Sequence, residues 1–82
     1  MIMRIDKFLK VSRILKRRTL ANSACDSDKV FVNGKAVKPA YRLKIGDVVT
    51  IEFLSGKLTF VVKALNEKAS KEEASTLYEI IN

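Results

Sequence analysis

The sequence predicts a single α+β domain over residues 1–82, in which two N-terminal helices pack on a small antiparallel sheet of about four strands and a third helix ends the chain. Three observations support this prediction. Apolar residues recur at helical spacing between Arg4 and Lys16, the period changes to two from Lys29 onwards, and Ser70–Glu73 fits a capping box. A chain of 82 residues can bury one small core, and a second domain would not fit.

The first helix is expected from Arg4 to about Lys16. At about 100° per residue, its core-facing side comprises Ile5, Phe8, Leu9, Ser12 and Leu15. A displaced, positively charged side comprises Lys7, Lys10, Arg13 and Arg17. The helix can therefore bury one side and present charge on the other.

A second short helix is expected after a sharp corner. It would begin near Thr19, within a segment of small and capping residues, and end near Asp26–Asp28. Leu20, Ala21 and Ala24 are expected to face the core.

The middle of the chain is expected to form antiparallel strands. Asn33-Gly34 lies between β-branched runs and predicts a hairpin with a type I′ turn, because both residues tolerate positive φ. Pro39 argues against a central strand around it. A turn at 45–47 would lead into a strand over 48–53, and a second turn near Ser55-Gly56 into a strand over 57–64.

The C-terminal segment is expected to form a helix over about 70–81. Ser70 and Glu73 can each satisfy a backbone N–H of the other. The apolar residues that come next at helical spacing are Ala74, Leu77, Tyr78 and Ile81.

Positive charge is concentrated in the first half of the chain. The formal net charge is +7, residues 1–18 hold seven bases and one acid, and residues 45–82 hold four bases and six acids. A one-sided excess of this kind creates a field that attracts a polyanion.

Composition argues against an enzyme. The chain has no histidine and one cysteine, and its glycines, at 34, 46 and 56, lie in separate turns. The usual nucleophile–base pairs and the phosphate-binding glycine loop are therefore missing, and we expect no cofactor and no metal. Cys25 lies among small residues, which favours a packed side chain over a reactive thiol.

A nucleic acid is a better candidate for the polyanionic partner than a membrane surface. No apolar run approaches the roughly 18 residues of a membrane span. A basic amphipathic helix could lie on a lipid surface, but Phe8, Leu9 and Leu15 are needed for the core. The sequence also lacks a long recognition helix, a zinc site and a zipper, so RNA is preferred to DNA. We expect a cytoplasmic monomer that does not bind membranes.

The densest charge lies at the corner between the first two predicted helices. Lys16, Arg17 and Arg18 come one helical turn after Arg13, and the N-terminus of the second helix would add exposed N–H groups. Arginine suits this position because its fork matches phosphate and stacks on bases.

These residues are part of a wider resemblance. The basic helix pair, then Val30, Val32, Asn33 and Gly34, then Lys44, Gly46 and Asp47 resemble the RNA-binding domain named after the fourth protein of the small ribosomal subunit, over residues 4–55. Length, the "MRIDKFLKVSRILKRR" opening and the "KEEA…LYEI" tail resemble the stand-alone, heat-shock-protein-fifteen-like group. Within it they are most similar to the bacterial ribosome-associated quality-control P-site tRNA branch.

The resemblance implies a set of RNA-binding residues: Arg4, Lys7, Arg13, Lys16, Arg17 and Arg18. Lys10 in the charged stripe and Asn33 and Lys35 at the hairpin complete our candidates. The resemblance also implies that Asp6 orients the neighbouring basic side chains and does not touch RNA. Asp28 stands where the family commonly has glycine, and aspartate tolerates the left-handed conformation that this turn requires.

The resemblance further implies a non-enzymatic factor. It would bind large ribosomal subunits that are obstructed by peptidyl-tRNA, and would stabilise the P-site tRNA during template-free tailing of the stalled chain. Its partners would be 23S-type ribosomal RNA, P-site tRNA and a tailing factor that recruits alanyl-tRNA. The alternatives are a general ribosomal-RNA-binding heat-shock or assembly factor and the detached RNA-binding portion of an RNA-modifying enzyme.

Overall fold

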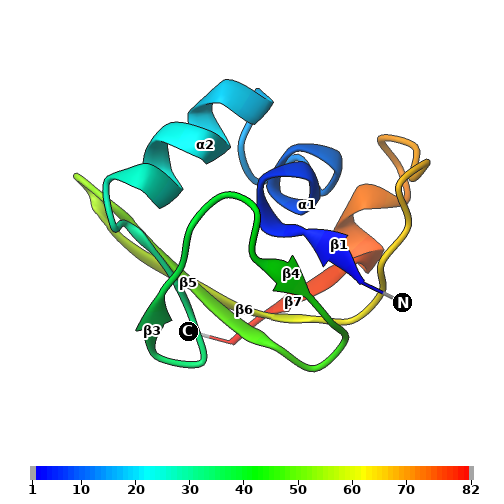
Figure 1. Cartoon of the computed structure of the whole chain (residues 1–82). Helices are drawn as coiled ribbons and strands as arrows, with labels where there is room; N and C mark the ends of the chain where they lie inside the picture. Colours follow the sequence, from blue (N-terminus) through cyan, green and yellow to red (C-terminus); the bar gives the residue numbers. More distant parts are fainter. Residues whose placement is uncertain (1, 82) are drawn as a thin grey trace.

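Residues 2–81 of the computed structural model form two layers, with two helices lying over one face of an antiparallel sheet (Figure 1). The elements in chain order are β1 (Met3–Arg4), α1 (Ile5–Val11), α2 (Arg18–Asp26), β2 (Val30–Val32), β3 (Lys35–Ala36), β4 (Arg42–Leu43), β5 (Val48–Phe53), β6 (Gly56–Val62), a 3₁₀ turn (Ala74–Thr76) and β7 (Tyr78–Ile80). The predicted fold class is confirmed in its helix pair and antiparallel sheet.

The main sheet has five strands in the order β3-β2-β5-β6-β7, and β1 and β4 form a separate two-stranded ribbon. In the long β5–β6 pair, Val49 lies opposite Phe60, and both are buried. Thr50 and Thr59, on the other face, are joined by a hydroxyl–hydroxyl hydrogen bond of 3.2 Å. Alternation along these strands thus separates a core face from an outer face.

Both turns for which the sequence predicts a left-handed backbone adopt it. Asn33 and Gly34 connect β2 to β3 with φ of +52° and +87°. Asp28, between α2 and β2, has φ of +58°, so aspartate does take the conformation for which the family commonly uses glycine.

The first helix is shorter than the sequence predicted. α1 ends at Val11, because Arg13 takes a φ of +62° and its N–H bonds to the carbonyl of Lys10 at 3.0 Å. The N–H of Leu15 then reaches back to the carbonyl of Leu9 at 3.0 Å. The predicted helix over 4–16 is wrong beyond Val11, since a left-handed residue ends helical hydrogen bonding.

The second helix is confirmed, but not every residue expected to face inward does so. Ala21 is fully buried and Ala24 is partly buried against the core, whereas half of the Leu20 surface (50 %) is exposed. The inward placement of Leu20 was therefore wrong. Ala21 and Cys25, four residues apart, form the buried side of α2, which rotates Leu20 outward.

The core joins α1 to the sheet. Phe8 stacks on Phe60 with ring centroids 6.1 Å apart, and Tyr78 meets Phe60 edge-on at 5.5 Å. Ile5 and Leu9 of α1 are fully buried beside them. α1 is consequently fixed against the sheet, and its charged side is held in one orientation.

The expected helix over about 70–81 is absent from the described residues. The capping box itself forms, since the Glu73 N–H donates to the Ser70 hydroxyl at 3.2 Å and the Ser70 N–H to the Glu73 carboxylate at 3.1 Å. Only one 3₁₀ turn comes after it, and then β7 pairs with the open edge of β6. A helix of this length is marginal by itself, whereas the strand places Tyr78 against Phe60.

Candidate nucleic-acid interface

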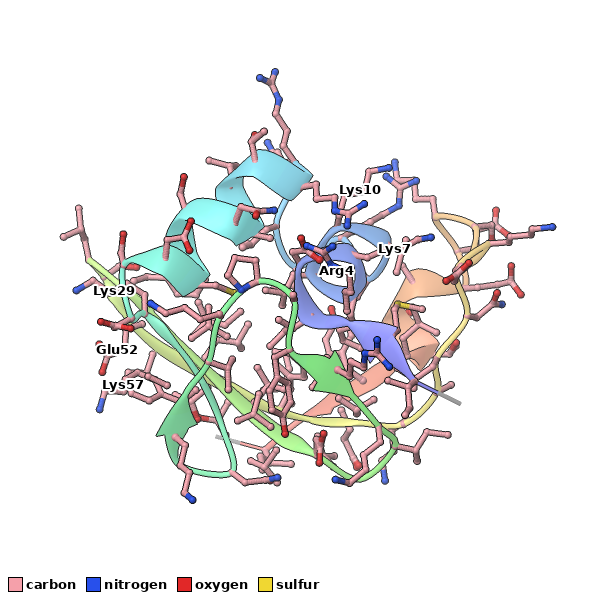
Figure 2. All side chains as sticks on the ribbon, viewed as in Figure 1. Arg4, Lys7, Lys10, Lys29, Glu52 and Lys57 are labelled. Atoms are coloured by element: carbon pink, nitrogen blue, oxygen red, sulfur yellow. The ribbon has the colours of Figure 1, made fainter. Side chains whose placement is uncertain are left out.

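Seven of the nine predicted binding residues lie between β1 and the start of α2. This basic surface comprises Arg4, Lys7, Lys10, Arg13, Lys16, Arg17 and Arg18. All are exposed except Lys7, which is partly buried. Figure 2 shows three of them, Arg4, Lys7 and Lys10, gathered over α1, on the opposite side of the view from Lys29 and the β5–β6 hairpin.

A buried carboxylate organises one end of the basic surface. Asp6 is fully buried, and the Arg4 guanidinium donates to its two oxygens at 3.0 and 3.2 Å. The Arg18 Nε lies 3.3 Å from Asp6 Oδ2, and the Asn22 amide donates to the same oxygen at 2.9 Å. Asp6 therefore holds guanidinium groups from β1 and α2 side by side. This confirms the expectation that it orients the neighbouring basic side chains.

The state of Asp6 is determined by these contacts. Burial acts to raise its pKa, but hydrogen bonds from Arg4, Asn22, Arg18 and the Lys7 N–H together lower the pKa below its ordinary value. Asp6 is thus a permanent anion at neutral pH. Each guanidinium has five N–H donors and uses only some of them to bind Asp6. Arg4 and Arg18 therefore both keep donors for a ligand.

A second cluster of cations lines a shallow cavity beside α1. Lys10, Arg13 and Lys16 surround about 460 Å³ of space, with Val11, Glu67 and Ala69 as its remaining lining. Glu67 also binds Lys7 at 3.3 Å. The segment before the 3₁₀ turn therefore contributes one acid to an otherwise cationic surface, which the sequence pattern did not indicate.

The corner between the helices places its arginines by unusual backbone geometry. A positive φ is uncommon for a residue such as Arg13, and here it lets the chain turn directly after α1. Arg17 is the N-cap residue of α2, and no side chain caps that helix end among the described residues. The first N–H groups of α2 therefore lie beside Arg17 and Arg18, in the arrangement that favours phosphate.

The two hairpin candidates lie elsewhere. The Asn33 amide donates to Asp47 at 3.2 Å, and its oxygen accepts the Val48 N–H at 3.0 Å, so this side chain ties the β2–β3 turn to β5. Lys35 is exposed on β3, which lies far from α1 in Figure 1. The fold does not bring Asn33 and Lys35 together with the other seven residues.

Arg42 belongs to the same region, although the sequence did not single it out. It lies directly opposite Arg4 in the β1–β4 ribbon. These two-residue strands carry no periodic signal, and their pairing depends on residues far apart in the chain. Sequence reasoning therefore had no means of placing Arg42 beside Arg4.

Among residues 2–81, the two helices and Cys25 offer no membrane span, metal cluster or reactive thiol. Within residues 2–81, neither helix is long and apolar enough to cross a membrane, and no three potential metal ligands cluster. The Cys25 side chain is buried, as expected. Its burial and the nearby Asp6 and Asp26 raise its pKa to about 11, so the thiol stays protonated.

Comparisons with known proteins agree with this geometry. An S4 domain matches residues 3–49. A protein from Halalkalibacterium halodurans named RQC P-site tRNA stabilizing factor is 47% identical over 78 residues, covering 95% of this chain and 89% of the relative. Its namesake in Bacillus subtilis is 43% identical over 79 residues, covering 96% and 92%.

A solved structure has the same fold. The trimeric structure of heat shock protein 15 from Vibrio cholerae superposes with a TM-score of 0.89 at 28% identity, covering 99% of this chain and 83% of that chain. With an S4 domain over more than half of its length and relatives above 40% identity along nearly all of it, the chain belongs to the family of RQC P-site tRNA stabilizing factors.

Proposed function

We propose that this chain is a non-enzymatic RNA-binding factor that stabilises P-site tRNA on obstructed large ribosomal subunits during ribosome-associated quality control. The observation that carries the proposal is the Asp6 contact with Arg4 and Arg18, which holds two exposed guanidinium groups on rigid elements. The name shared by relatives at 43–47% identity supports it.

The mechanism is binding without a covalent step. Guanidinium groups donate in pairs to phosphate oxygens, and a pre-arranged pair loses less entropy on binding than two free side chains. α1 is fixed by the Phe8–Phe60 stack, so the basic surface stays in one geometry. A tRNA that contacts this surface would have its motion restricted, which keeps it in the P site.

The proposed partners are those that this role requires. They are 23S-type ribosomal RNA, P-site tRNA and a tailing factor that recruits alanyl-tRNA. We propose that the chain acts as a monomer in the bacterial cytoplasm. The proposed contacts are made by the basic surface, with Asn33 and Lys35 as candidates for a separate contact at the β2–β3 hairpin.

Co-sedimentation with purified large subunits tests the proposal. The wild-type chain should migrate with subunits that carry peptidyl-tRNA and much less with empty subunits. Arg4→Ala/Arg18→Ala should remain at the top of the gradient. Lys29→Ala/Lys71→Ala is the matched control, because it removes the same charge from exposed lysines outside the basic surface, and it should behave like the wild type. Equal binding to subunits with and without tRNA would contradict a role in holding tRNA.

A general ribosomal-RNA-binding heat-shock or assembly factor is the second candidate, but the name shared by the relatives at 43–47% identity fits it less well than it fits the first proposal. The two candidate functions differ in whether binding to the large subunit requires tRNA. A general factor would bind empty subunits or free ribosomal RNA as well as it binds subunits with tRNA. If about five phosphates are contacted, the log–log salt slope of binding should lie near −3.5 to −4.5 in either case, so the tRNA requirement decides between them.

A further inference from the structure

The stability of the fold does not explain why residue 42 is an arginine. Arg42 pairs with Arg4 across the β1–β4 ribbon, and directly opposed residues of an antiparallel pair point to the same face. Their neighbours Met3 and Leu43 point the other way and are buried. Like charges in direct opposition destabilise a strand pair. The fold needs only an exposed polar residue here, and a second arginine works against it.

The two arginines share a cleft with other cations. A depression of about 340 Å³ is lined by Ile2, Met3, Arg4, Lys7, Arg18, Arg42 and Glu67. Its single acid, Glu67, is bound to Lys7 at 3.3 Å. Arg4 and Arg18 are partly neutralised by Asp6. Arg42 makes no ion pair or side-chain hydrogen bond with any residue in 2–81, so its charge is fully available to a ligand.

We propose that Arg4, Arg18 and Arg42 form a three-guanidinium clamp for a backbone phosphate of structured RNA. Asp6 fixes the first two groups, and Arg42 lines the same depression from β4. A phosphodiester fits because its two non-bridging oxygens accept paired N–H donors and its charge relieves the repulsion between Arg4 and Arg42. This inference rests on the proposed RNA-binding function and adds a contact to it.

The test compares Arg42→Ala, Arg42→Lys and Lys29→Ala. Lys29 is exposed and lies at the left edge of the view in Figure 2, away from Arg4, the strand partner of Arg42, and its replacement removes the same unit of charge. Binding to deacylated tRNA would be measured by fluorescence anisotropy over a range of salt concentrations. Thermal unfolding of each variant would be measured beside it.

The clamp predicts that Arg42→Ala weakens tRNA binding about tenfold, as for the loss of one charge-assisted hydrogen bond. The salt slope should become shallower by about 0.7 to 0.9. Arg42→Lys should keep the slope but bind about threefold more weakly, because an ammonium lacks the planar fork. The melting temperature of Arg42→Ala should stay the same or rise, since a like-charge pair is removed.

Two results separate this inference from the function on which it rests. If Arg42→Ala and Lys29→Ala lose affinity equally, the clamp is wrong, even if the wild type still migrates with tRNA-bearing subunits. If Arg42→Ala alone weakens tRNA binding while the wild type ignores large subunits, the clamp stands and the ribosomal role fails. A wild-type chain that binds no tRNA at all would overturn both.

Discussion

Two buried aspartates lie in different regions of the molecule and differ in the partners that they hold. Asp6 is fully buried, and its partners are guanidinium groups and an amide drawn from β1 and α2. Asp47 is nearly as buried (3 %), and it accepts the Lys44 N–H at 3.1 Å and the Asn33 amide at 3.2 Å. One carboxylate positions side chains that face solvent, whereas the other closes backbone turns.

The comparison shows that burial of a charge does not reveal its role. Both carboxylates satisfy the requirement that buried charges be paired, since the Lys44 ammonium lies 4.0 Å from Asp47. The partners decide what is lost when the carboxylate is removed. Removing Asp6 should release Arg4 and Arg18 from their shared geometry, and removing Asp47 should loosen the β2–β3 and β4–β5 connections. Binding and stability should therefore respond differently.

The largest effect is expected for Asp6→Asn. The change raises the net positive charge by one, which by itself would strengthen RNA binding. We expect roughly ten- to a hundredfold weaker binding instead, because two guanidinium groups lose a charged hydrogen-bond partner. Asp26→Asn, which alters an exposed acid on α2 by the same charge, is the control in an anisotropy titration with tRNA. Tighter binding by Asp6→Asn would show that charge alone governs the interaction.

Asp47→Ala should lower the stability of the fold and leave tRNA binding nearly unchanged. Two hydrogen bonds at the turns are lost, so we expect the free energy of unfolding to fall by about 1–3 kcal/mol. The basic surface is untouched, and tRNA affinity at a temperature well below melting should fall by no more than about threefold. Urea unfolding and the same titration measure both quantities. An affinity loss as large as that of Asp6→Asn would place the β2–β3 hairpin within the main interface.

The lowered pKa of Asp6 predicts a pH dependence. Because the pKa is lower in the folded state than the ordinary value of 3.8, the carboxylate contributes stability that is fully present above that value. This contribution is lost as the pH falls through the folded-state pKa. Urea unfolding of the wild type and Asp6→Asn should show a stability difference that is constant from pH 7 to 5 and shrinks below about pH 3.8. A constant difference down to pH 2.5 would show that Asp6 titrates normally.

The smallest expected effect on stability comes from Arg13. Glycine at this position would relieve the left-handed backbone and stabilise the fold by about 1 kcal/mol, while tRNA binding weakens several-fold for want of the guanidinium. Arg13→Ala removes the same charge but keeps the backbone strain. The two variants should bind tRNA equally and differ only in melting temperature. Weaker binding by the glycine variant would mean that rigidity at the corner also contributes.

Much of the fold could be predicted because its signals are local. Asn33-Gly34 specifies its turn through conformational tolerance, and the Ser70–Glu73 capping box forms as its sequence indicates. The strand that comes after the capping box could not be predicted, because β7 gains its stability from pairing with β6. The end of α1 was missed for a similar reason: the left-handed Arg13 is required by the corner rather than by its own propensity.

The candidate site also contains residues that the sequence identified and residues that it could not place. Charge periodicity and the family resemblance identified seven cations. Six of them line two depressions that share Glu67: Lys10, Arg13 and Lys16 line one, and Arg4, Lys7 and Arg18 line the other. The orienting role of Asp6 was also expected, and its contacts confirm it. Arg42 and Glu67 could not be placed, since each reaches the basic surface through contacts between segments far apart in the chain.

A double-mutant cycle between Asp6→Asn and Arg18→Ala, measured as affinity for large subunits carrying peptidyl-tRNA, tests the central claim most directly. If Asp6 acts by holding Arg18 for RNA, its removal should matter much less once Arg18 is gone. The account predicts that the double variant loses less affinity than the two single losses combined, with a coupling of about 1 kcal/mol or more. Losses that simply add would contradict the claim that the buried carboxylate works through the arginine.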